Sequence, residues 1–302
     1  MSILNTTPSC ETCGVSFSPP GEVVGIQNNS GHKNCLSPEF VYSVNGFRIL
    51  CCPRCRLLWT DVPQNFQAGK LYEEEFFQGK SPNGYFDYLG TAQLLNNEFI
   101  QRARLVHKYQ SAGRLLDVGC ATGNFIKAAR QYFDVKGIDI SSFAVEAAIQ
   151  DGLPAACGTL EELEKTPQSY DIITMFDTLE HVPNPQATLQ QSHSLLKKDG
   201  IVVISTGDAS SVLAKLAGKR WRLMTPPEHL WFFSRRNLGI LLERTGFSVL
   251  DCVYPWRQVP VSLMWFQIFR GRQKPLPDWI GKMTFPVNLF DAITVVAKKM
   301  DV

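Results

Sequence analysis

The sequence predicts an α/β fold in which a doubly wound, mostly parallel sheet of seven strands follows a small amino-terminal module. Three observations carry this prediction. Strand and helix patterns alternate from residue 114 onward, a glycine-rich turn follows the first of these strands, and two Cys-x-x-Cys pairs lie near the amino terminus. Regular alternation of this kind is typical of a parallel sheet covered by helices on both faces.

Short apolar runs of strand length mark the strands of the expected sheet. They cover residues 114–118, 135–139, 154–157, 170–175, 201–205, 247–254 and 291–297. Helical patterns cover 124–133, 143–150, 160–165, 186–196 and 235–245. Apolar residues also recur at helical spacing from Leu94 to Tyr109, before the first strand.

Composition sets bounds on the class of protein. The chain has 302 residues, 44% of them apolar, so it can bury one large core or two smaller cores. Its formal charge of +2 does not indicate general binding to polyanions. No stretch approaches the roughly 18 uninterrupted apolar residues of a membrane span, and the start lacks the order of a signal peptide. We therefore expect a cytoplasmic protein, in which nine cysteines favour metal ligation over disulfides.

Four of these cysteines form the two pairs near the amino terminus. They are Cys10, Cys13, Cys52 and Cys55. In a Cys-x-x-Cys turn both thiolates reach one tetrahedral ion, and four sulfur ligands suit zinc. A redox dithiol and unliganded buried thiols remain alternatives, and Cys51 is an alternative ligand to Cys52.

The chain between the two cysteine pairs has little capacity for a core of its own. Two short strands, 40–44 and 47–50, are expected on either side of an Asn45-Gly46 turn. A structural zinc ion would supply the missing stability. Residues 1–70 are therefore predicted to form a zinc-ribbon-like module.

The turn after the first strand is typical of a nucleotide site. Gly119 and Gly123 lack a Cβ atom, so the backbone between them can approach a ligand. Asp117 precedes the turn, and Asp139 ends the second strand about 20 residues on, where an acid typically contacts ribose hydroxyls. Since ligands of such sheets bind beyond the carboxyl ends of the strands, these residues together predict a cofactor containing adenosine. An ordinary glycine-rich turn is the alternative.

The glycine spacing narrows the class of cofactor. A dinucleotide fingerprint needs glycine at positions 119, 121 and 124, where the chain has Gly119, Ala121 and Asn124. The pattern Asp117-x-Gly119-x-x-x-Gly123 instead resembles motif I of class I S-adenosylmethionine-dependent methyltransferases. The resemblance extends through residues 114–254 and the end of the chain.

Two further segments carry the resemblance. Residues 170–182, which end in Phe-Asp-Thr-Leu-Glu-His-Val, are similar to the fourth strand of quinone-biosynthesis O-methyltransferases and related small-molecule enzymes. Residues 226–234, Pro-Pro-Glu-His-Leu-Trp-Phe-Phe-Ser, resemble a subgroup from polysaccharide, antibiotic-sugar and cell-envelope pathways. Some members of that subgroup have a cysteine-rich zinc module ahead of the catalytic fold.

The resemblance implies a Rossmann-like methyltransferase fold, S-adenosylmethionine as cofactor, and roles for particular residues. Asp117 and the backbone of the turn would hold the methionine part, Asp139 the ribose, and Ile140 and Leu160 the adenine, with Phe176 and Asp177 near the methionine part. The turn residues concerned are Gly119, Cys120, Ala121 and Gly123. Purely structural roles remain alternatives, with Asp117 capping the turn and Ile140 in the core.

Methyl transfer from a sulfonium is an in-line displacement, so the protein mainly aligns the acceptor and excludes water. A hydroxyl or acidic C–H acceptor also needs a base, and histidine is suited to this near neutral pH. We expect His181 and the Glu228-His229 pair at the open end of the sheet, where one histidine orients or deprotonates the acceptor. Alternatively, His181 caps the next helix and His229 holds a loop.

The expected acceptor is a small molecule, a sugar or a lipid-linked compound, methylated at oxygen or carbon. Amine-methylating enzymes of this superfamily commonly place an Asn/Asp-Pro-Pro-aromatic turn after the fourth strand, and this chain has Phe-Asp-Thr-Leu-Glu-His there. Nucleobase methylation is therefore disfavoured. The alternative function is that of a zinc-dependent RNA- or protein-binding protein on the same fold, including a nucleic-acid methyltransferase, with binding that depends steeply on salt.

The expected domain organisation has three parts. Residues 1–70 form the zinc module, 71–112 a connector and amino-terminal helix, and 113–302 the catalytic domain with a helical insertion at about 256–288. The insertion combines Trp256, Trp265 and Trp279 with several basic residues. It is consistent with a membrane-surface helix or a lid over an amphipathic acceptor, but it fits better with a helical cover for the sheet edge or a self-association surface. The oligomeric state is left open.

Overall fold

A computed structural model describes residues 9–14, 37–63, 66, 68–71, 96–163, 168–261, 265, 277–281 and 283–301. Its largest sheet has seven strands in the order β10-β13-β8-β7-β4-β5-β6. They are β4 (Arg114–Val118), β5 (Asp134–Asp139), β6 (Ala155–Cys157), β7 (Tyr170–Phe176), β8 (Leu196–Gly207), β10 (Phe247–Val253) and β13 (Ala292–Lys299). Strand β13 runs antiparallel to both neighbours, whereas the other pairs are parallel. The predicted α/β class and mostly parallel sheet are confirmed.

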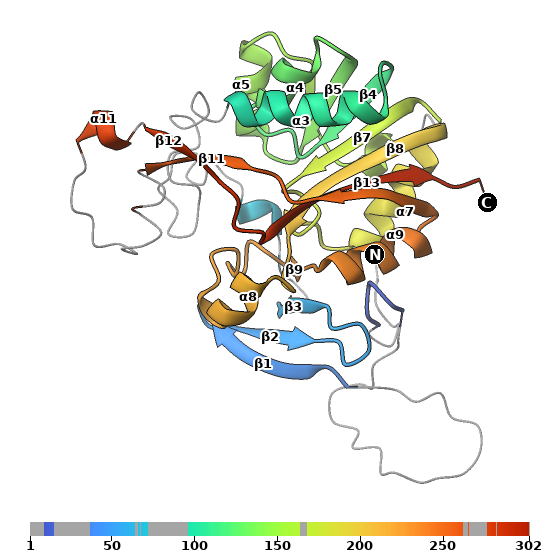
Figure 1. The fold of residues 1–302 in the computed structure, drawn as a ribbon. Coiled ribbons are helices and arrows are strands. Elements are labelled where there is room, and N and C mark those ends of the chain that lie inside the picture. The colour runs from blue at the N-terminus through green and yellow to red at the C-terminus, as the bar shows by residue number, and fades with distance from the viewer. Residues whose placement is uncertain are drawn as a thin grey trace.

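Helices cover both faces of this sheet because successive side chains of a strand point to opposite sides. Leu115 and Ile172 belong to one buried cluster, whereas their neighbours Leu116 and Ile173 belong to the other. The first cluster includes residues of α3 (Asn96–Tyr109), α4 (Asn124–Ala129) and α5 (Ser142–Gln150), and the second includes residues of α6 (Leu160–Leu163), α7 (Pro185–Leu195) and α9 (Arg235–Arg244). Figure 1 shows α3, α4 and α5 together above the sheet.

Some element bounds differ from the sequence prediction. Helix α4 ends at Ala129, four residues before the expected end. Strand β8 extends over Leu196–Gly207 and pairs with both β7 and β13, which makes it a long central strand. The expected helix and strand on either side of residue 196 therefore meet without the intervening loop that the prediction assumed.

The segment expected to be a helical insertion contains an antiparallel hairpin. Strands β11 (Arg257–Pro260) and β12 (Thr284–Val287) pair, and the short helix α11 (Asp278–Gly281) precedes β12. The expectation of a helical insertion is thus wrong for its described ends, where Val259 pairs with Phe285 and Arg257 with Val287, since β-branched and aromatic side chains favour strands. Residues 262–264 and 266–276 lie outside the described residues. In Figure 1 the hairpin projects from the left of the main sheet.

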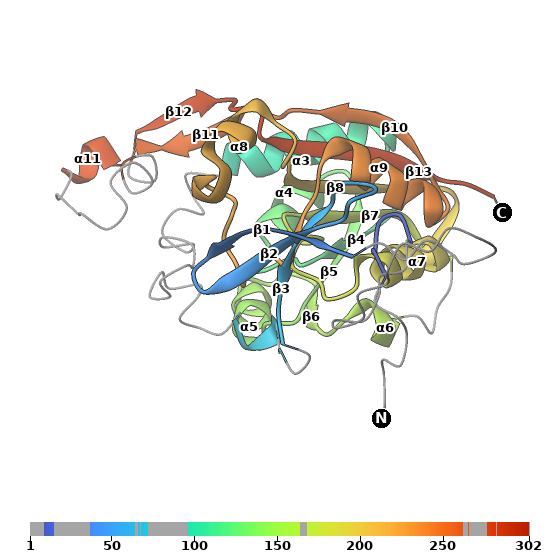
Figure 2. The same ribbon diagram turned by 90° about the horizontal axis from the view of Figure 1, so that it is seen from below.

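The amino-terminal segment joins a later part of the chain in a second sheet. Strands β1 (Glu39–Val44), β2 (Phe47–Cys51) and β3 (Leu58–Asp61) are followed in the sheet by β9 (Trp231–Phe232). Asn45 and Gly46 have φ angles of 50° and 82°, as the expected two-residue turn requires. Strands β1, β2 and β3 lie below the larger sheet in Figure 1 and in front of it in the view from below in Figure 2.

The remaining described elements are short. They are the 3-10 helices η1 (Ala68–Leu71) and η2 (Gly218–Arg220) and the helix α8 (Val212–Ala217). Within the described part of the chain, no helix combines the length and the apolar character that a membrane crossing demands.

Candidate functional site

The predicted cofactor residues come together at the carboxyl ends of β4, β5 and β7. From β4, the chain continues to β5 and β6 on one side, and β7 and β8 lie on the other side. The strand order therefore reverses between β4 and β7, where open α/β sheets bind their ligands. Gly119 follows β4, Asp139 ends β5, and Asp177 follows β7.

The turn after β4 depends on its glycines. Gly119 and Gly123 have φ angles of 75° and 78°, in the left-handed region. A Cβ atom on Gly119 would overlap the Thr178 side chain, whose hydroxyl donates to the carbonyl oxygen of Val118 at 3.1 Å. A side chain at position 119 would thus push the turn away from the end of β7.

Asp139 connects this turn to the start of α5. Its Oδ2 atom accepts a hydrogen bond from the backbone N–H of Ala121 at 2.9 Å, and Oδ1 accepts one from Ser141 at 2.9 Å. Burial raises the pKa of the carboxyl group, while these backbone donors act to lower it. Each carboxylate oxygen keeps a second lone pair for a hydroxyl donor such as a ribose.

Asp117 and the neighbouring cysteine lie beneath the turn. The Asp117 carboxylate is 3% exposed and accepts a hydrogen bond from the Thr174 hydroxyl at 2.7 Å, which ties β4 to β7. Burial raises the pKa of Asp117 to about 7. Cys120 is also buried, and its side chain lies against Gly137. These two side chains support the turn from inside the fold.

The two residues expected beside the adenine differ in exposure. Ile140, directly after Asp139, is 47% exposed, whereas Leu160 is 4% exposed and belongs to the core cluster that includes α7 and α9. Because Ile140 is exposed, the alternative that this residue belongs to the core is wrong. An exposed apolar side chain beside a carboxylate fits the flat face of a base next to its ribose.

An ion-pair cluster at the end of β7 was missed by sequence reasoning. Asp177 accepts hydrogen bonds from Arg102 at 2.7 Å and from Arg257 at 3.0 Å, and Glu98 also pairs with Arg102 at 2.7 Å. Burial favours a raised pKa for Asp177, but Arg257 and Arg102 hold it well below its usual range. The Arg102 guanidinium lies 4.8 Å from the centre of the Phe176 ring. The only sequence signal was the Glu98–Arg102 spacing of four residues on one helix.

The two predicted histidines lie side by side, close enough to this cluster to feel the charge of Asp177. The ring centroids of His181 and His229 are 4.7 Å apart in an edge-on arrangement. His181 Nδ1 lies 2.8 Å from the carbonyl oxygen of Glu228, and because a carbonyl only accepts, this nitrogen carries the proton. One side chain oxygen or nitrogen from each of Glu180, His181 and His229 lies within 4.8 Å of the others.

Burial controls the protonation of this group. It lowers the pKa of His229 to about 3, with His181 as the next cause, and it also lowers the pKa of His181. It raises the pKa of Glu180 to about 8, with help from the negative charge of Asp177. Both imidazoles are therefore neutral near pH 7 and able to accept a proton, although the same lowering makes His229 a weaker base than an ordinary histidine.

The structure decides the helix-capping alternative for His181. Asn184, not His181, caps α7, since its side chain accepts from the backbone N–H of Ala187. The alternative of His181 as a helix cap is therefore wrong. The Glu228 side chain is 6% exposed, and the backbone carbonyl of this residue is the acceptor for His181.

The four cysteines of the two predicted pairs also come together. Sγ of Cys10 lies 3.5 Å from that of Cys55, Sγ of Cys13 lies 3.7 Å from that of Cys52, and all four lie within 4.8 Å of one another. A hydrogen bond from Cys10 lowers the pKa of the Cys55 thiol. Cys51 points elsewhere and donates to the Cys52 carbonyl oxygen. The set containing Cys52 thus fits the four-sulfur site, and Cys51 does not.

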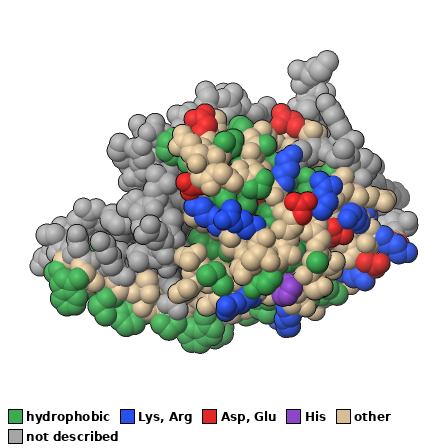
Figure 3. Space-filling view, turned by 90° about the horizontal axis from the view of Figure 1, so that it is seen from above, with side chains coloured by type: hydrophobic (Ala, Val, Ile, Leu, Met, Phe, Trp, Pro, Cys, Tyr) green, Lys and Arg blue, Asp and Glu red, His purple; other side chains and the backbone are tan. Residues whose placement is uncertain are grey.

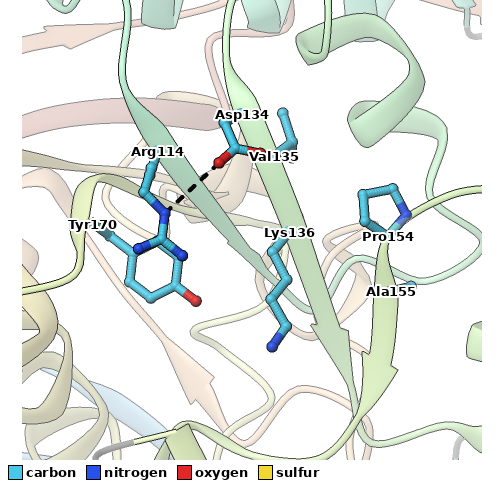
Figure 4. Close-up of a pocket in the computed structure, with 7 residues that line it drawn as sticks. All are labelled: Arg114, Asp134, Val135, Lys136, Pro154, Ala155 and Tyr170. Carbon is cyan, nitrogen blue, oxygen red and sulfur yellow. Dashed lines mark ion pairs between the residues drawn. The ribbon is translucent and has the colours of Figure 1, made fainter. Parts of the chain in front are cut away.

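A shallow pocket lies at the other end of the strands of the main sheet, where β4, β5 and β7 begin. Figure 4 shows Arg114, Asp134 and Tyr170 around it, near the amino ends of β4, β5 and β7. Arg114 and Asp134 form an exposed ion pair at 3.7 Å. This pocket is remote from the glycine turn and carries none of the predicted site residues.

Comparisons with known proteins agree with the geometry of the strand ends. The family described as Methyltransferase domain matches residues 88–251, just over half of the chain. A ubiquinone biosynthesis O-methyltransferase of Neisseria meningitidis is 32% identical over 155 residues, which cover 46% of this chain and 65% of that protein. The chain thus spans less than two thirds of that relative.

Two further similarities extend the comparison. The protein of the same name from Ralstonia nicotianae is 32% identical over 56% of this chain and 74% of its own length. A solved structure from Thermotoga maritima, described as an S-adenosylmethionine-dependent methyltransferase and possible histamine N-methyltransferase, has a TM-score of 0.52 at 19% identity. It covers 74% of this chain and 99% of that chain, and at this identity it shows the fold alone.

Proposed function

We propose, from the premise that the chain belongs to the Methyltransferase domain family, that it transfers the methyl group of S-adenosylmethionine to oxygen or carbon of a small-molecule, lipid or saccharide acceptor. The observation that carries this proposal is the meeting of the Gly119 turn with Asp139 at the switch point of the sheet. An oxygen acceptor is favoured because the relatives are named O-methyltransferases.

The residues at the strand ends divide the work of binding the cofactor. Asp139 would hold the ribose hydroxyls, Ile140 and Leu160 would contact the adenine, and the turn supported by Asp117 and Cys120 would lie along the methionine part. Phe176 and Asp177 would border the sulfonium from the β7 side. The bound cofactor supplies an already activated methyl group, so the protein mainly aligns the acceptor and keeps water out.

His229 is the proposed base, with His181 beside it and Glu228 fixing His181 through its backbone carbonyl. A neutral imidazole on the acceptor side takes the proton of a hydroxyl as the oxygen attacks the methyl carbon. Because burial keeps both rings neutral near pH 7, neither has to lose a proton first.

A screen for labelled-methyl transfer tests this function. The purified chain is incubated with S-adenosylmethionine labelled in the methyl group and with lipid, saccharide or phenolic extracts. Label in an oxygen- or carbon-linked methyl group of one fraction supports the proposal. Label confined to RNA or protein amines supports the alternative of a nucleic-acid- or protein-directed protein, whose RNA binding should weaken steeply with salt.

We also propose that Cys10, Cys13, Cys52 and Cys55 hold one structural zinc ion, and that residues 1–70 act as a zinc-ribbon-like module ahead of the connector at 71–112 and the catalytic part at 113–302. Sulfur separations of 3.5 and 3.7 Å suit the edges of a tetrahedral four-sulfur site. Three of the four cysteines are buried in the core cluster with Leu57.

Metal analysis of two cysteine variants checks this assignment. We expect Cys55→Ser to lower the zinc content from about one per chain towards zero, and to lower Tm by about 10 °C, because the metal offsets a small core. The sulfur of Cys51 lies outside the group of four cysteines, so Cys51→Ser should leave the zinc content unchanged. A wild-type chain without zinc would contradict the assignment.

A third proposal concerns a peripheral membrane contact of a cytoplasmic protein. Exposed aromatic residues gather near the β11–β12 hairpin, with Trp256 60%, Trp279 70% and Phe290 59% exposed. Figure 3 shows hydrophobic side chains along the lower left edge, where this hairpin lies. Exposed tryptophan and phenylalanine side chains are suited to the interface of a lipid surface, where a lipid-linked acceptor would be found.

Co-sedimentation with anionic vesicles measures this contact. We expect the double substitution of Trp279 and Phe290 by serine to weaken vesicle binding by about tenfold, since binding scales with the apolar area inserted. Val212→Ser provides a control, because this side chain is 75% exposed on α8. Equal binding by wild type and the double variant would show that the hairpin is not a membrane contact.

A further inference from the structure

The loop that carries His229 is held by hydrogen bonds to three consecutive carbonyl groups. The carbonyl oxygen of Glu228 accepts from His181 Nδ1 at 2.8 Å. That of His229 accepts from the Thr60 hydroxyl at 2.7 Å, and that of Leu230 accepts from the Thr60 backbone N–H at 2.9 Å. Two of the three donors therefore belong to one residue of the amino-terminal module.

The opposite edge of the loop is anchored on the catalytic side. The backbone N–H groups of Leu230 and Trp231 both donate to the carbonyl oxygen of Glu180, at 2.9 and 3.1 Å. Since Glu180 and His181 are adjacent, this anchor fixes the second histidine at the same time. Thr60 thus holds this loop from the side of the amino-terminal module, as Glu180 holds it from the other side.

Thr60 is well placed to act as a fixed donor. It is 4% exposed and lies on β3, whose residues Leu58 and Trp59 pair with Phe232 and Trp231 of β9. A buried hydroxyl with one acceptor in range has little freedom to turn away. The pairing of β3 with β9 sets the register that brings this hydroxyl under the His229 carbonyl.

The cysteine cluster lies directly before β3. The backbone N–H of Cys52 donates to the carbonyl oxygen of Leu57 at 2.8 Å, and that of Arg56 donates to Cys52 at 2.9 Å, which closes the turn that carries Cys55. Leu57 is fully buried in the core cluster that also holds Cys10, Cys52 and Cys55. Order in this turn therefore fixes where β3 begins.

We propose that Thr60 is a positioning residue for His229, so that the cysteine-rich module sets the geometry of the acceptor site in addition to stabilising the chain. The inference rests on the proposed function, in which His229 faces the acceptor. Loss of the Thr60 hydroxyl leaves a buried carbonyl without this donor and lets the loop at 228–230 move. A displacement of about 1 Å at a catalytic group is enough to slow a reaction strongly.

Three substitutions of matched size test the proposal. Thr60→Val removes the hydroxyl and keeps the shape, Thr60→Ser keeps the hydroxyl, and Thr60→Ala separates its loss from any misfit of the valine methyl group. Thr12→Val is the control, because Thr12 is a fully buried threonine of the same module whose hydroxyl has no hydrogen-bond partner within the described residues. Zinc content and Tm are recorded for each variant.

The main readout is the ring of His229, which requires no acceptor. The chain has five histidines, so the ¹⁵N signals of their rings are assignable with a His229→Gln variant. We expect Thr60→Val and Thr60→Ala to raise the His229 pKa by about one unit or more, as the loosened loop admits water. Thr60→Ser and Thr12→Val should leave the wild-type titration unchanged.

Methyl transfer to the fraction found in the labelled-methyl screen gives the second readout. Thr60→Val should lower kcat about tenfold, with the affinity for S-adenosylmethionine within about twofold of wild type. Wild-type titration of His229 in both Thr60→Val and Thr60→Ala would overturn the inference. If His229→Ala keeps full turnover, the base role falls instead, while the titration still decides whether Thr60 positions the ring.

Discussion

Replacing Gly119 with alanine is expected to weaken the binding of S-adenosylmethionine by about a hundredfold, which corresponds to about 2.7 kcal/mol. The left-handed φ of 75° costs an alanine about 1–2 kcal/mol. The added Cβ atom would also overlap the Thr178 side chain at the end of β7. Relief of that overlap requires the turn to move across the surface that the cofactor would occupy.

Gly152→Ala provides the control for backbone strain. Gly152 has a φ angle of 69°, close to that of Gly119, but no atom lies within 4 Å of the added Cβ. Calorimetric titration should give this variant a cofactor affinity within about twofold of wild type. Equal losses of affinity in both variants would show that the close approach of the turn to β7 is unimportant.

Replacing His229 with alanine is expected to lower kcat for methyl transfer by about 10²–10⁴-fold while the affinity for S-adenosylmethionine stays the same. The reason is that the ring lies beside His181, where the proposed function places the acceptor. His193→Ala is the control, because this histidine is on α7 and contacts Met300 and Phe247. Full turnover in the His229 variant would remove the base role.

The pH profile adds an independent check on His229. A base works in its neutral form, so activity falls when the pH drops below its pKa. Burial lowers the pKa of His229 to about 3, so its protonation should produce no acid limb near pH 6.5, the ordinary value for histidine. Asp117 and Glu180 have pKa values of about 7 and about 8, so an acid limb in that range can come from either carboxyl group. The ring signal of His229 separates the cases: a titration of this ring near pH 6.5 would contradict a buried, neutral base, and in Thr60→Val its midpoint should move towards that value.

The sequence was informative where the chemistry of a residue depends on its near neighbours. The alternation of strands and helices predicted the sheet because the period of apolar residues is a local property. The spacing of Asp117, Gly119 and Asp139 predicted the site at the strand ends because all three residues belong to one strand-helix-strand segment of the chain. The Asn45-Gly46 turn was also readable, since both residues adopt positive φ angles easily.

The parts that escaped prediction depend on pairing between distant segments. Arg102 and Arg257 meet at Asp177, although they lie far from it in the sequence. The β3–β9 pairing brings Thr60 to the loop that carries His229, and pairing between such distant segments leaves no periodic pattern in the sequence. The sequence predicts a helical insertion where the β11–β12 hairpin lies, because short apolar runs do not distinguish a helix from a strand by period alone.

Calorimetric titration of the full chain with S-adenosylmethionine, and separately with NAD, decides whether the Gly119 turn and Asp139 form a site for S-adenosylmethionine. We expect saturable binding of S-adenosylmethionine at about one site per chain, about a hundredfold weaker binding in Gly119→Ala, and no binding of NAD. Binding of NAD in place of S-adenosylmethionine, or S-adenosylmethionine binding that is unaffected by Gly119→Ala, would contradict this assignment.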